Sequence, residues 1–184
     1  MVIVFIGPPG CGKGTQANIL KDSILPDLNI LTVSSLLKEK SQDESILGKD
    51  IKNKMNNGDL IEDTIVISVL KEKVNTLSNE QILIDGFPRS SIQADSLLEI
   101  FQNKDLRIIN FDVDDEQLLQ RIKKRSMEES RADDSFFEKR LLIYKKSHLE
   151  ILNSLKKNYP VTDIKANDEI STVTAKIVDK LGLN

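Results

Sequence analysis

A glycine-rich stretch near the N-terminus has the composition of a phosphate-binding loop. Residues 7–15 read Gly-Pro-Pro-Gly-Cys-Gly-Lys-Gly-Thr, between the apolar run 2–6 and a segment with helical spacing, 16–25. Several backbone N–H groups can converge on one polyphosphate only where glycine permits unusual φ angles and close approach. The following helix adds free N–H groups and a positive dipole end, and Lys13 adds a mobile charge. This order predicts a nucleotide-phosphate site.

The residue after the lysine departs from the general pattern of such loops. It is Gly14, and the hydroxyl that commonly contacts magnesium comes one place later, at Thr15. A contact between Thr15 and Mg²⁺ is therefore a weaker expectation than the lysine contact. Cys11 is expected to fill space in the loop. Because it is the single cysteine of the sequence, an intramolecular disulfide and a zinc site made of cysteines are excluded.

A second group of chemically useful residues follows the apolar run 81–85. Strands of parallel α/β sheets end at the ligand crevice, so Asp85 is a candidate to hold the water shell of Mg²⁺ beside the phosphate loop. The rigid turn 86–89 then presents the guanidinium of Arg89 close to that acid. A guanidinium suits two-pronged phosphate contacts, although a surface ion pair is the plainer alternative.

Four arginines surround a short polar connection over residues 127–135. They are Arg121, Arg125, Arg131 and Arg140. They could clamp a polyphosphate, or they could form a solvated helix face, as charge runs usually do. Taken in isolation, the two interpretations weigh equally. His148 has no partner cluster in the sequence, and we assign it no chemistry.

Short apolar runs alternate with amphipathic segments along the chain. Strands are expected at 2–6, 29–33, 81–85, 107–113 and 160–164. Helices are expected at 16–25, about 44–56, 91–101 and 136–157, with others beginning at Ser34 as N-cap, after Ile61, at Asp114 and at Asp168. In the helix 136–157, the residues expected to face inward are Leu142, Leu149, Leu152 and Leu155. The alternation predicts an α/β fold, a five-stranded parallel sheet flanked by helices on both sides.

Length and composition narrow the class of protein. A chain of 184 residues makes one domain, and 39% apolar with 30% charged residues is typical of a globular protein. The net charge of −3 argues against a general nucleic-acid or membrane-surface binder. No apolar run reaches spanning length and no export signal is visible, so the cytoplasm is the expected compartment.

Together, these motifs resemble the nucleoside monophosphate kinases, and most of all the short-form adenylate kinases. The resemblance covers nearly the whole chain, in the family's order. Its residues are Gly7 to Thr15, Gly58-Asp59-Leu60-Ile61, Asp85-Gly86-Phe87-Pro88-Arg89 with Gln93, Arg121 with Arg125, and Arg131-Ala132-Asp133-Asp134 with Arg140. The resemblance implies a single domain 1–184 of the P-loop type. Its core would be 1–30, 59–125 and 136–184, its AMP-binding segment about 31–58, and its lid about 126–135, without structural zinc.

The resemblance also implies an activity and roles for residues. The reaction would be ATP + AMP ⇌ 2 ADP with Mg²⁺, serving adenine nucleotide homeostasis, in a monomer. ATP would be bound by Gly10, Cys11, Gly12, Lys13, Gly14, Thr15 and Arg121. AMP would be bound by Val33, Lys38, Leu60, Ile61, Gly86, Arg89, Gln93, Arg131 and Arg140. The catalytic set would be Lys13, Asp85, Arg89, Arg125, Arg131 and Arg140, with magnesium on Asp85 through water and, less securely, on Thr15.

The resemblance to adenylate kinases is least complete at the residues expected to bind the acceptor nucleotide. Gln93 can donate and accept toward adenine, whereas pyrimidine-specific relatives usually carry Asn at this place. Adenylate kinases usually read Thr-Gly-Asp, two residues, then Arg, where this chain has Val33-Ser34-Ser35-Leu36-Leu37-Lys38. We therefore expect weaker or less selective AMP binding. The alternatives are a UMP/CMP kinase and a nucleotide-binding regulator of low activity.

Overall fold

A computed structural model describes residues 1–77, 81–102, 104–128 and 136–183, and their side chains except at 125–128. Its strands are β1 Val2–Ile6, β2 Asn29–Thr32, β3 Ile82–Asp85, β4 Leu106–Asp112 and β5 Val161–Lys165. Its helices are α1 Lys13–Ser23, α2 Val33–Lys40, α3 Ile46–Asn56, α4 Asp63–Asn75, α5 Ser91–Ile100, α6 Asp115–Glu128, α7 Phe137–Asn158 and α8 Ile170–Leu181. The predicted alternation of strands and helices is confirmed.

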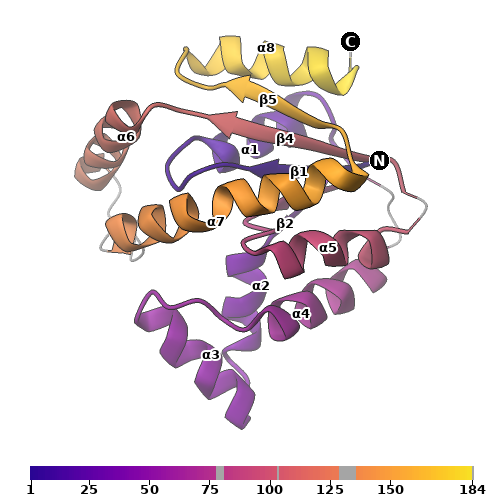
Figure 1. Cartoon of the computed structure of the whole chain (residues 1–184), viewed down its shortest axis with the longest axis vertical. Coiled ribbons are helices and arrows are strands. Elements are labelled where there is room, and N and C mark those ends of the chain that lie inside the picture. Colours follow the sequence, from indigo (N-terminus) through magenta and orange to yellow (C-terminus); the bar gives the residue numbers. More distant parts are fainter. Residues whose placement is uncertain (78–80, 103, 129–135, 184) are drawn as a thin grey trace.

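The strands form one parallel sheet with the order β2-β3-β1-β4-β5. The chain leaves β1 for β2, returns to β3 beside β1, and then crosses to β4 on the other side of β1. The connections after β1 and β3 therefore leave the sheet in opposite directions, which opens a crevice at the carboxyl end of β1. The glycine-rich loop follows β1 at that point (Figure 1).

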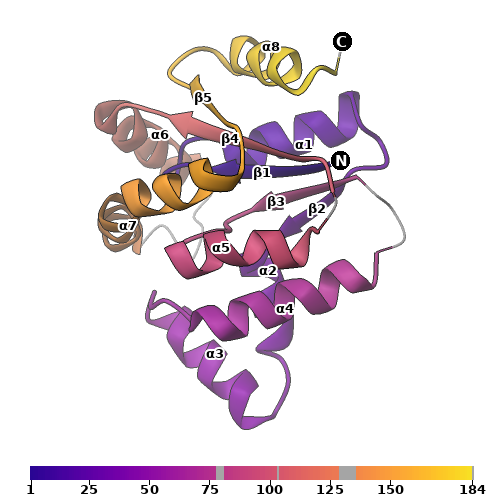
Figure 2. The same ribbon diagram turned by 45° about the vertical axis from the view of Figure 1, so that its right-hand side comes forward.

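Alternate residues of β1 divide the core into two layers. Val2 and Val4 belong to a cluster with side chains from α2, α4, α5 and α7. Ile3 and Phe5 belong to a cluster with side chains from α1, α6 and α8. In Figure 2, α1 and α8 lie above the sheet and α5 and α7 lie below it. A strand covered on both faces needs apolar residues at every position, and every residue of β1 is buried.

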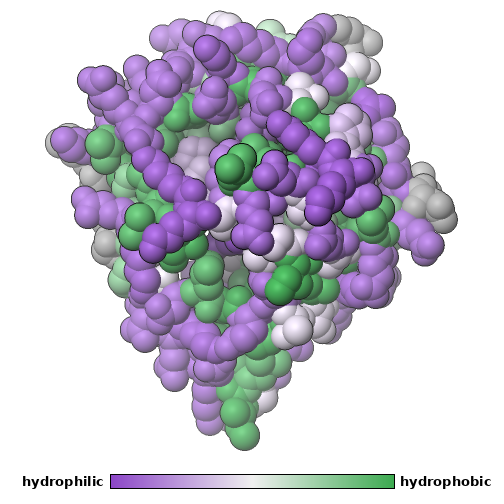
Figure 3. All heavy atoms as spheres, viewed as in Figure 1, coloured by the Kyte–Doolittle hydropathy of each residue, from purple (hydrophilic) through white to green (hydrophobic). Residues whose placement is uncertain are grey.

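The helices α2 and α3 form the end of the molecule farthest from α8 (Figures 1 and 2). Ile51 of α3 is fully buried and joins the core layer that holds α4 and α5. Ile46, the first residue of α3, is 90% exposed. Figure 3 shows a largely hydrophilic surface with apolar side chains at this tip. No helix in the described ranges has the length and apolar character needed to cross a membrane.

Three details differ from the sequence expectation. Helix α1 begins at Lys13, three residues early, because Gly12 is its N-cap in a left-handed conformation with φ 102°. Helix α2 begins at Val33 with Thr32 as N-cap, so the prediction of Ser34 as cap is wrong. The expected inward faces of Leu142 and Leu149 are also wrong, since these side chains are 55% and 70% exposed.

The inward-facing positions of α7 lie one residue before those two leucines, at 141 and 148. Residues 137, 141, 144, 148, 151 and 155 alternate three and four apart, and all of them are buried or half-buried. This is the spacing of one helix face. Tyr144 and His148 occupy two of its positions, and their polarity hides the pattern in the sequence.

Candidate active site at the ends of β1 and β3

The glycine-rich loop has the backbone shape that its composition predicts. Gly10 and Gly12 have φ of 82° and 102°, in the region that favours glycine. A Cβ at Gly10 would lie 2.9 Å from Ile122 Cδ1, so a close approach also requires glycine there. A Cβ at Gly12 would meet nothing within 4 Å, which leaves the loop open on that side. The loop therefore has room for a ligand beside its backbone.

Lys13 is folded over the loop that precedes it. Its Nζ donates to the carbonyl oxygens of Gly7 at 2.8 Å and Pro8 at 3.0 Å, and lies 3.4 Å from Cys11 Sγ. These partners are neutral, and a phosphate oxygen accepts a stronger, charge-assisted hydrogen bond. The ammonium is thus held at the loop by contacts that an anionic phosphate can replace. Cys11 is buried, as a loop filler should be.

Asp85 lies beside the first turn of α1. It pairs in register with Phe5 of β1, and its Oδ2 is 3.9 Å from the position of a Cβ on Gly14. Thr15 is exposed on the same turn. The described residues contain no cluster of three His, Cys, Asp or Glu side chains suited to a metal. One carboxylate and one hydroxyl beside a phosphate loop fit Mg²⁺, which usually keeps several waters and takes substrate phosphates as ligands.

Arg89 is held against the turn that carries it. The turn contains a cis Phe87–Pro88 bond, and Gly86 has φ 86°. Arg89 Nε donates to the Gly86 carbonyl at 2.9 Å, and a Cβ on Gly86 would lie 3.0 Å from an Arg89 terminal nitrogen. A side chain at position 86 would displace the guanidinium. The turn therefore holds the guanidinium against its own backbone, in the segment that follows Asp85.

Gln93 lies at the centre of a network that the sequence reasoning missed. Its side chain is 3% exposed, its Oε1 accepts from the Arg89 N–H at 2.7 Å, and its Nε2 donates to Asp63 Oδ1 at 2.7 Å. Ser90, the N-cap of α5, accepts from the Gln93 N–H at 3.1 Å and donates to Asp63 Oδ2 at 2.8 Å. The spacing Ser-x-x-Gln is a capping-box signal that could have found Ser90. Nothing in the local sequence indicates Asp63.

Of the four arginines predicted to surround the phosphates, two have side chains that the structure describes. Arg121 donates to the Cys11 carbonyl at 3.2 Å and to the Ala166 carbonyl at 2.6 Å, so it joins the loop to the segment after β5. Arg140 is half-buried near the start of α7. Arg131 and the side chain of Arg125 lie outside the described residues.

The predicted AMP-binding segment presents a mixture of buried and exposed residues. Val33 and Ile61 are 4% and 8% exposed, Leu60 is 49% exposed, and Lys38 is exposed on α2. The end of the segment adjoins the start of α7. There, Lys139 Nζ donates to the Asn57 carbonyl at 3.0 Å and pairs with Asp59 Oδ1 at 2.7 Å.

Contacts at the same junction explain why residue 58 is a glycine. Gly58 ends α3 with φ 64°, and a Cβ there would lie 2.8 Å from Phe136 Cγ. Phe136 therefore packs directly on the turn of the segment. Since residue 136 follows the predicted lid, the AMP-binding segment and the base of that lid are neighbours.

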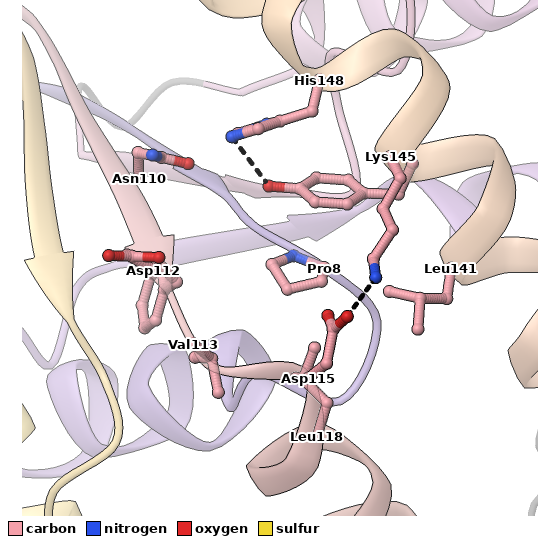
Figure 4. A pocket seen from close by; sticks show the side chains of 11 residues that line it. Pro8, Asn110, Asp112, Val113, Asp115, Leu118, Leu141, Lys145 and His148 are labelled. Carbon is pink, nitrogen blue, oxygen red and sulfur yellow. Dashed lines mark hydrogen bonds and ion pairs between the residues drawn. The ribbon is translucent and has the colours of Figure 1, made fainter.

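A cavity of about 120 Å³ lies between β4, α7 and Pro8 of the loop (Figure 4). Asn110 donates to Asp163 Oδ1 at 2.7 Å, and its Oδ1 has no hydrogen-bond partner among the described residues. The Tyr144 hydroxyl and His148 Nε2 are 3.3 Å apart. Burial lowers the pKa of His148 and raises that of Tyr144. Burial of this ring therefore favours its neutral form.

Comparisons with known proteins agree on one family. Residues 5–160 match the family described as adenylate kinase. The adenylate kinase of Leptospira biflexa is 29% identical over 185 residues, covering 97% of this chain and 98% of the relative. That of Prochlorococcus marinus (strain MIT 9211) is 32% identical over 186 residues, covering 98% and 97%. That of Borrelia duttonii is 40% identical over 128 residues, which cover 68% of this chain and 57% of the length of that relative.

Proposed function

The chain belongs to the adenylate kinase family, and from that premise we propose that it transfers the γ-phosphoryl group of Mg²⁺-ATP reversibly to AMP, giving two ADP. Adenylate kinases are nucleoside monophosphate kinases, a class of phosphotransferases. The observation that best supports the proposal is that Asp85 and the segments that carry Lys13 and Arg89 stand at the carboxyl ends of the neighbouring strands β1 and β3. These ends form the crevice in which α/β sheets bind ligands.

Positioning and charge neutralisation account for the reaction. An oxygen of the AMP phosphate attacks the γ-phosphorus in line, and the negative charge spreads over the transferred oxygens. We assign the ATP phosphates to the amides of Gly10, Cys11, Gly12, Gly14 and Thr15 and to Lys13. The AMP phosphate is assigned to Arg89. Arg121 is assigned to the ATP base side, and Arg125, Arg131 and Arg140 to the transferred group.

Magnesium would be held by Asp85 through water, with Thr15 as a further contact. When bound, Mg²⁺ neutralises phosphate charge and orders the phosphate oxygens. Asp85 would act from the second coordination layer, which agrees with a single carboxylate beside the α1 turn. We propose no structural zinc.

The acceptor side of the site uses the segment of about 31–58 and the residues that follow it. We assign AMP to Val33, Lys38, Leu60, Ile61, Gly86 and Gln93, together with the arginines. Val33 is buried and offers no hydroxyl, and Lys38 replaces a two-pronged contact by a point charge. AMP binding should accordingly be weaker than in relatives with Thr and Arg at these places.

We propose that the chain divides into a core, an AMP-binding segment and a lid with the bounds expected from the sequence. The core is residues 1–30, 59–125 and 136–184, and the lid is about 126–135. Closure of the lid and the AMP-binding segment would exclude water from the passing phosphoryl group. We further propose that the protein acts as a monomer in the cytoplasm, with free nucleotides and neither nucleic acid nor membrane as partners.

A panel of acceptors tests the proposal directly. ADP formation is measured with Mg²⁺-ATP and equal concentrations of AMP, UMP, CMP and dAMP. We expect kcat/KM to be higher for AMP than for UMP and CMP, because the Gln93 amide can both donate to and accept from adenine. A UMP/CMP kinase would show its highest kcat/KM with a pyrimidine nucleotide, and a regulator would show almost no turnover with any acceptor. Either result would refute the proposal.

A further inference from the structure

Asp63 joins two elements that contribute to the acceptor side of the site. It is the first residue of α4, directly after the turn 58–62 that ends the AMP-binding segment. Its Oδ1 accepts from Gln93 Nε2 at 2.7 Å and its Oδ2 accepts from the Ser90 hydroxyl at 2.8 Å. Both donors belong to the start of α5, which follows the Arg89 turn. The carboxylate therefore ties α4 to α5 beside the proposed AMP phosphate site.

These contacts leave the Gln93 amide only one orientation. A carboxylate only accepts hydrogen bonds, and the Arg89 backbone N–H only donates. Gln93 must therefore turn Nε2 toward Asp63 Oδ1, which lies 2.7 Å away. It must turn Oε1 toward the backbone nitrogen of Arg89, also at 2.7 Å. The side chain is 3% exposed, so neither group can take water as a substitute partner without rearrangement. Within the described residues, one N–H and one oxygen lone pair of the amide have no further hydrogen bond, and in the proposed function these would face the base.

The orientation matters because purine edges differ in polarity. Adenine presents a donor at N6 and an acceptor at N1, whereas hypoxanthine presents an acceptor at O6 and a donor at N1. The two bases have nearly the same size, so an amide distinguishes them only if its donor and acceptor ends are fixed. Reversing the amide would exchange the preference.

We propose that Asp63 is a positioning residue that fixes the Gln93 amide in the orientation that selects adenine over a 6-oxopurine in the acceptor nucleotide. The proposal rests on the proposed function, in which Gln93 reads the AMP base. Asp63 acts through Gln93 and does not itself touch the nucleotide. Its second contact, to Ser90, holds the α5 cap in the place that this orientation requires.

The test compares AMP with IMP, which carries hypoxanthine, as acceptors for the full-length protein. In Asp63→Asn, residue 63 can accept or donate, so both orientations of Gln93 become possible. We expect the ratio of kcat/KM for AMP over IMP to fall about tenfold, the order of one hydrogen bond, chiefly through a higher KM for AMP. KM for ATP should stay within about twofold of the original value, because within the described residues the Asp63 side chain bonds to Ser90 and Gln93 and not to the glycine-rich loop.

Glu62→Gln is the matched control. Glu62 is the adjacent acid, it is exposed, and it pairs with Lys54 instead of Gln93. The variant removes the same charge one residue away. Its AMP-over-IMP ratio should equal that of the unmodified protein.

A conservative variant separates positioning from support of the fold. Asp63→Glu keeps an acceptor-only group, so it should recover most of the AMP-over-IMP ratio even where its urea midpoint is no higher than that of Asp63→Asn. If Asp63→Asn does not fold, Asp63→Gln and Asp63→Glu form the pair, and the same difference is expected between them. A ratio unchanged by Asp63→Asn, or equal in the Glu and amide variants, would overturn the inference.

Failure of this inference is distinct from failure of the proposed function. An unmodified protein that does not phosphorylate AMP, or prefers a pyrimidine acceptor, refutes the proposed function. An unmodified protein that prefers AMP, with a ratio insensitive to position 63, refutes the positioning role alone.

Discussion

At the scale of single residues, backbone carbonyl groups orient three cations of the candidate site. Lys13 donates to two carbonyls of its own loop, Arg89 to the Gly86 carbonyl, and Arg121 to the Cys11 and Ala166 carbonyls. For Lys13, a phosphate oxygen would accept a stronger, charge-assisted hydrogen bond than these carbonyls do.

Replacing Lys13 by Ala removes the charge at the loop. We expect kcat for ADP formation to fall by about 10²–10³-fold, the effect of losing one pre-positioned donor to a developing negative charge. The urea midpoint should change little, because the lysine donates to two backbone carbonyls and the Cys11 sulfur and to no carboxylate among the described residues. Steady-state kinetics and urea unfolding on the same preparation check both statements, with Lys21→Ala of α1 as control. Retention of more than half of the activity would contradict the assignment.

His148 makes the stability of the fold sensitive to mild acid. Burial lowers its pKa from the ordinary value of 6.5, the carboxylates of Asp163 and Asp112 partly oppose this shift, and Lys156 adds to it. The unfolded chain therefore binds a proton at a higher pH than the folded chain does. It follows that the free energy of unfolding should decrease as the pH falls through and below about 6.5.

Because His148 is the single histidine of the chain, one proton resonance reports its titration. The NMR midpoint should lie below 6.5, and His148→Gln should flatten the dependence of the urea midpoint between about pH 7 and 5. A midpoint at or above the ordinary value would show that burial does not control this imidazole.

At the scale of elements, a strand and a helix hold the two ends of the glycine-rich loop. β1 is buried on both faces, and α1 begins at Lys13 after the left-handed Gly12. Gly14 and Thr15 therefore lie in the first turn of α1, where N–H groups are free of helical partners. The turn of Arg89 is fixed in the same way between β3 and α5, with Ser90 as the cap of α5.

Helix α7 offers an internal comparison of two leucines. Leu155 is 1% exposed within the core, whereas Leu149 is 70% exposed. Leu155→Ala should lower the free energy of unfolding by about 2–5 kcal/mol, and Leu149→Ala by less than about 0.5 kcal/mol. Urea unfolding of the two variants measures both values. Similar losses for the two would contradict the observed phase of α7.

The sequence foretold those elements in which local pattern and tertiary role coincide. Strand β1, the glycine-rich loop, and the placing of Asp85 and Arg89 at a strand end all follow from composition and spacing. The phase of α7 did not follow, because Tyr144 and His148 stand at inward positions and Leu142 and Leu149 at outward ones. Asp63 was missed because its contact with Gln93 spans 30 residues and depends on how α4 and α5 pack.

At the scale of the whole molecule, the segments proposed to bind ATP and AMP adjoin different layers of the core. Side chains of the loop and α1 belong to the core layer that contains α8. Side chains of the Arg89 turn and α4 belong to the core layer that contains α5 and part of α7. Just after the proposed AMP-binding segment, Asp59 pairs with Lys139 of α7. As a surface ion pair, this contact alone contributes little energy.

A ligand that engages both sides should stabilise the whole fold. At a concentration about 100 times its Kd, a bisubstrate dinucleotide, two adenosines joined by five phosphates, should raise the free energy of unfolding by about 2.7 kcal/mol. For a domain of this size, Tm should rise by roughly 5–10 °C. Calorimetry of the protein with and without the dinucleotide measures the shift. At the same ligand concentration, Lys13→Ala should show a smaller shift, and an equal one would argue against binding at the loop.

The central claim is that the amides of one loop and the fixed cations around it bring two nucleotides together end to end. A crystal structure with the bisubstrate dinucleotide and Mg²⁺ tests it most directly. We predict that the phosphate chain runs along the loop 7–15, past Lys13, and ends at the guanidinium of Arg89. A dinucleotide bound away from the loop, or an Arg89 side chain turned to solvent in the complex, would contradict the account.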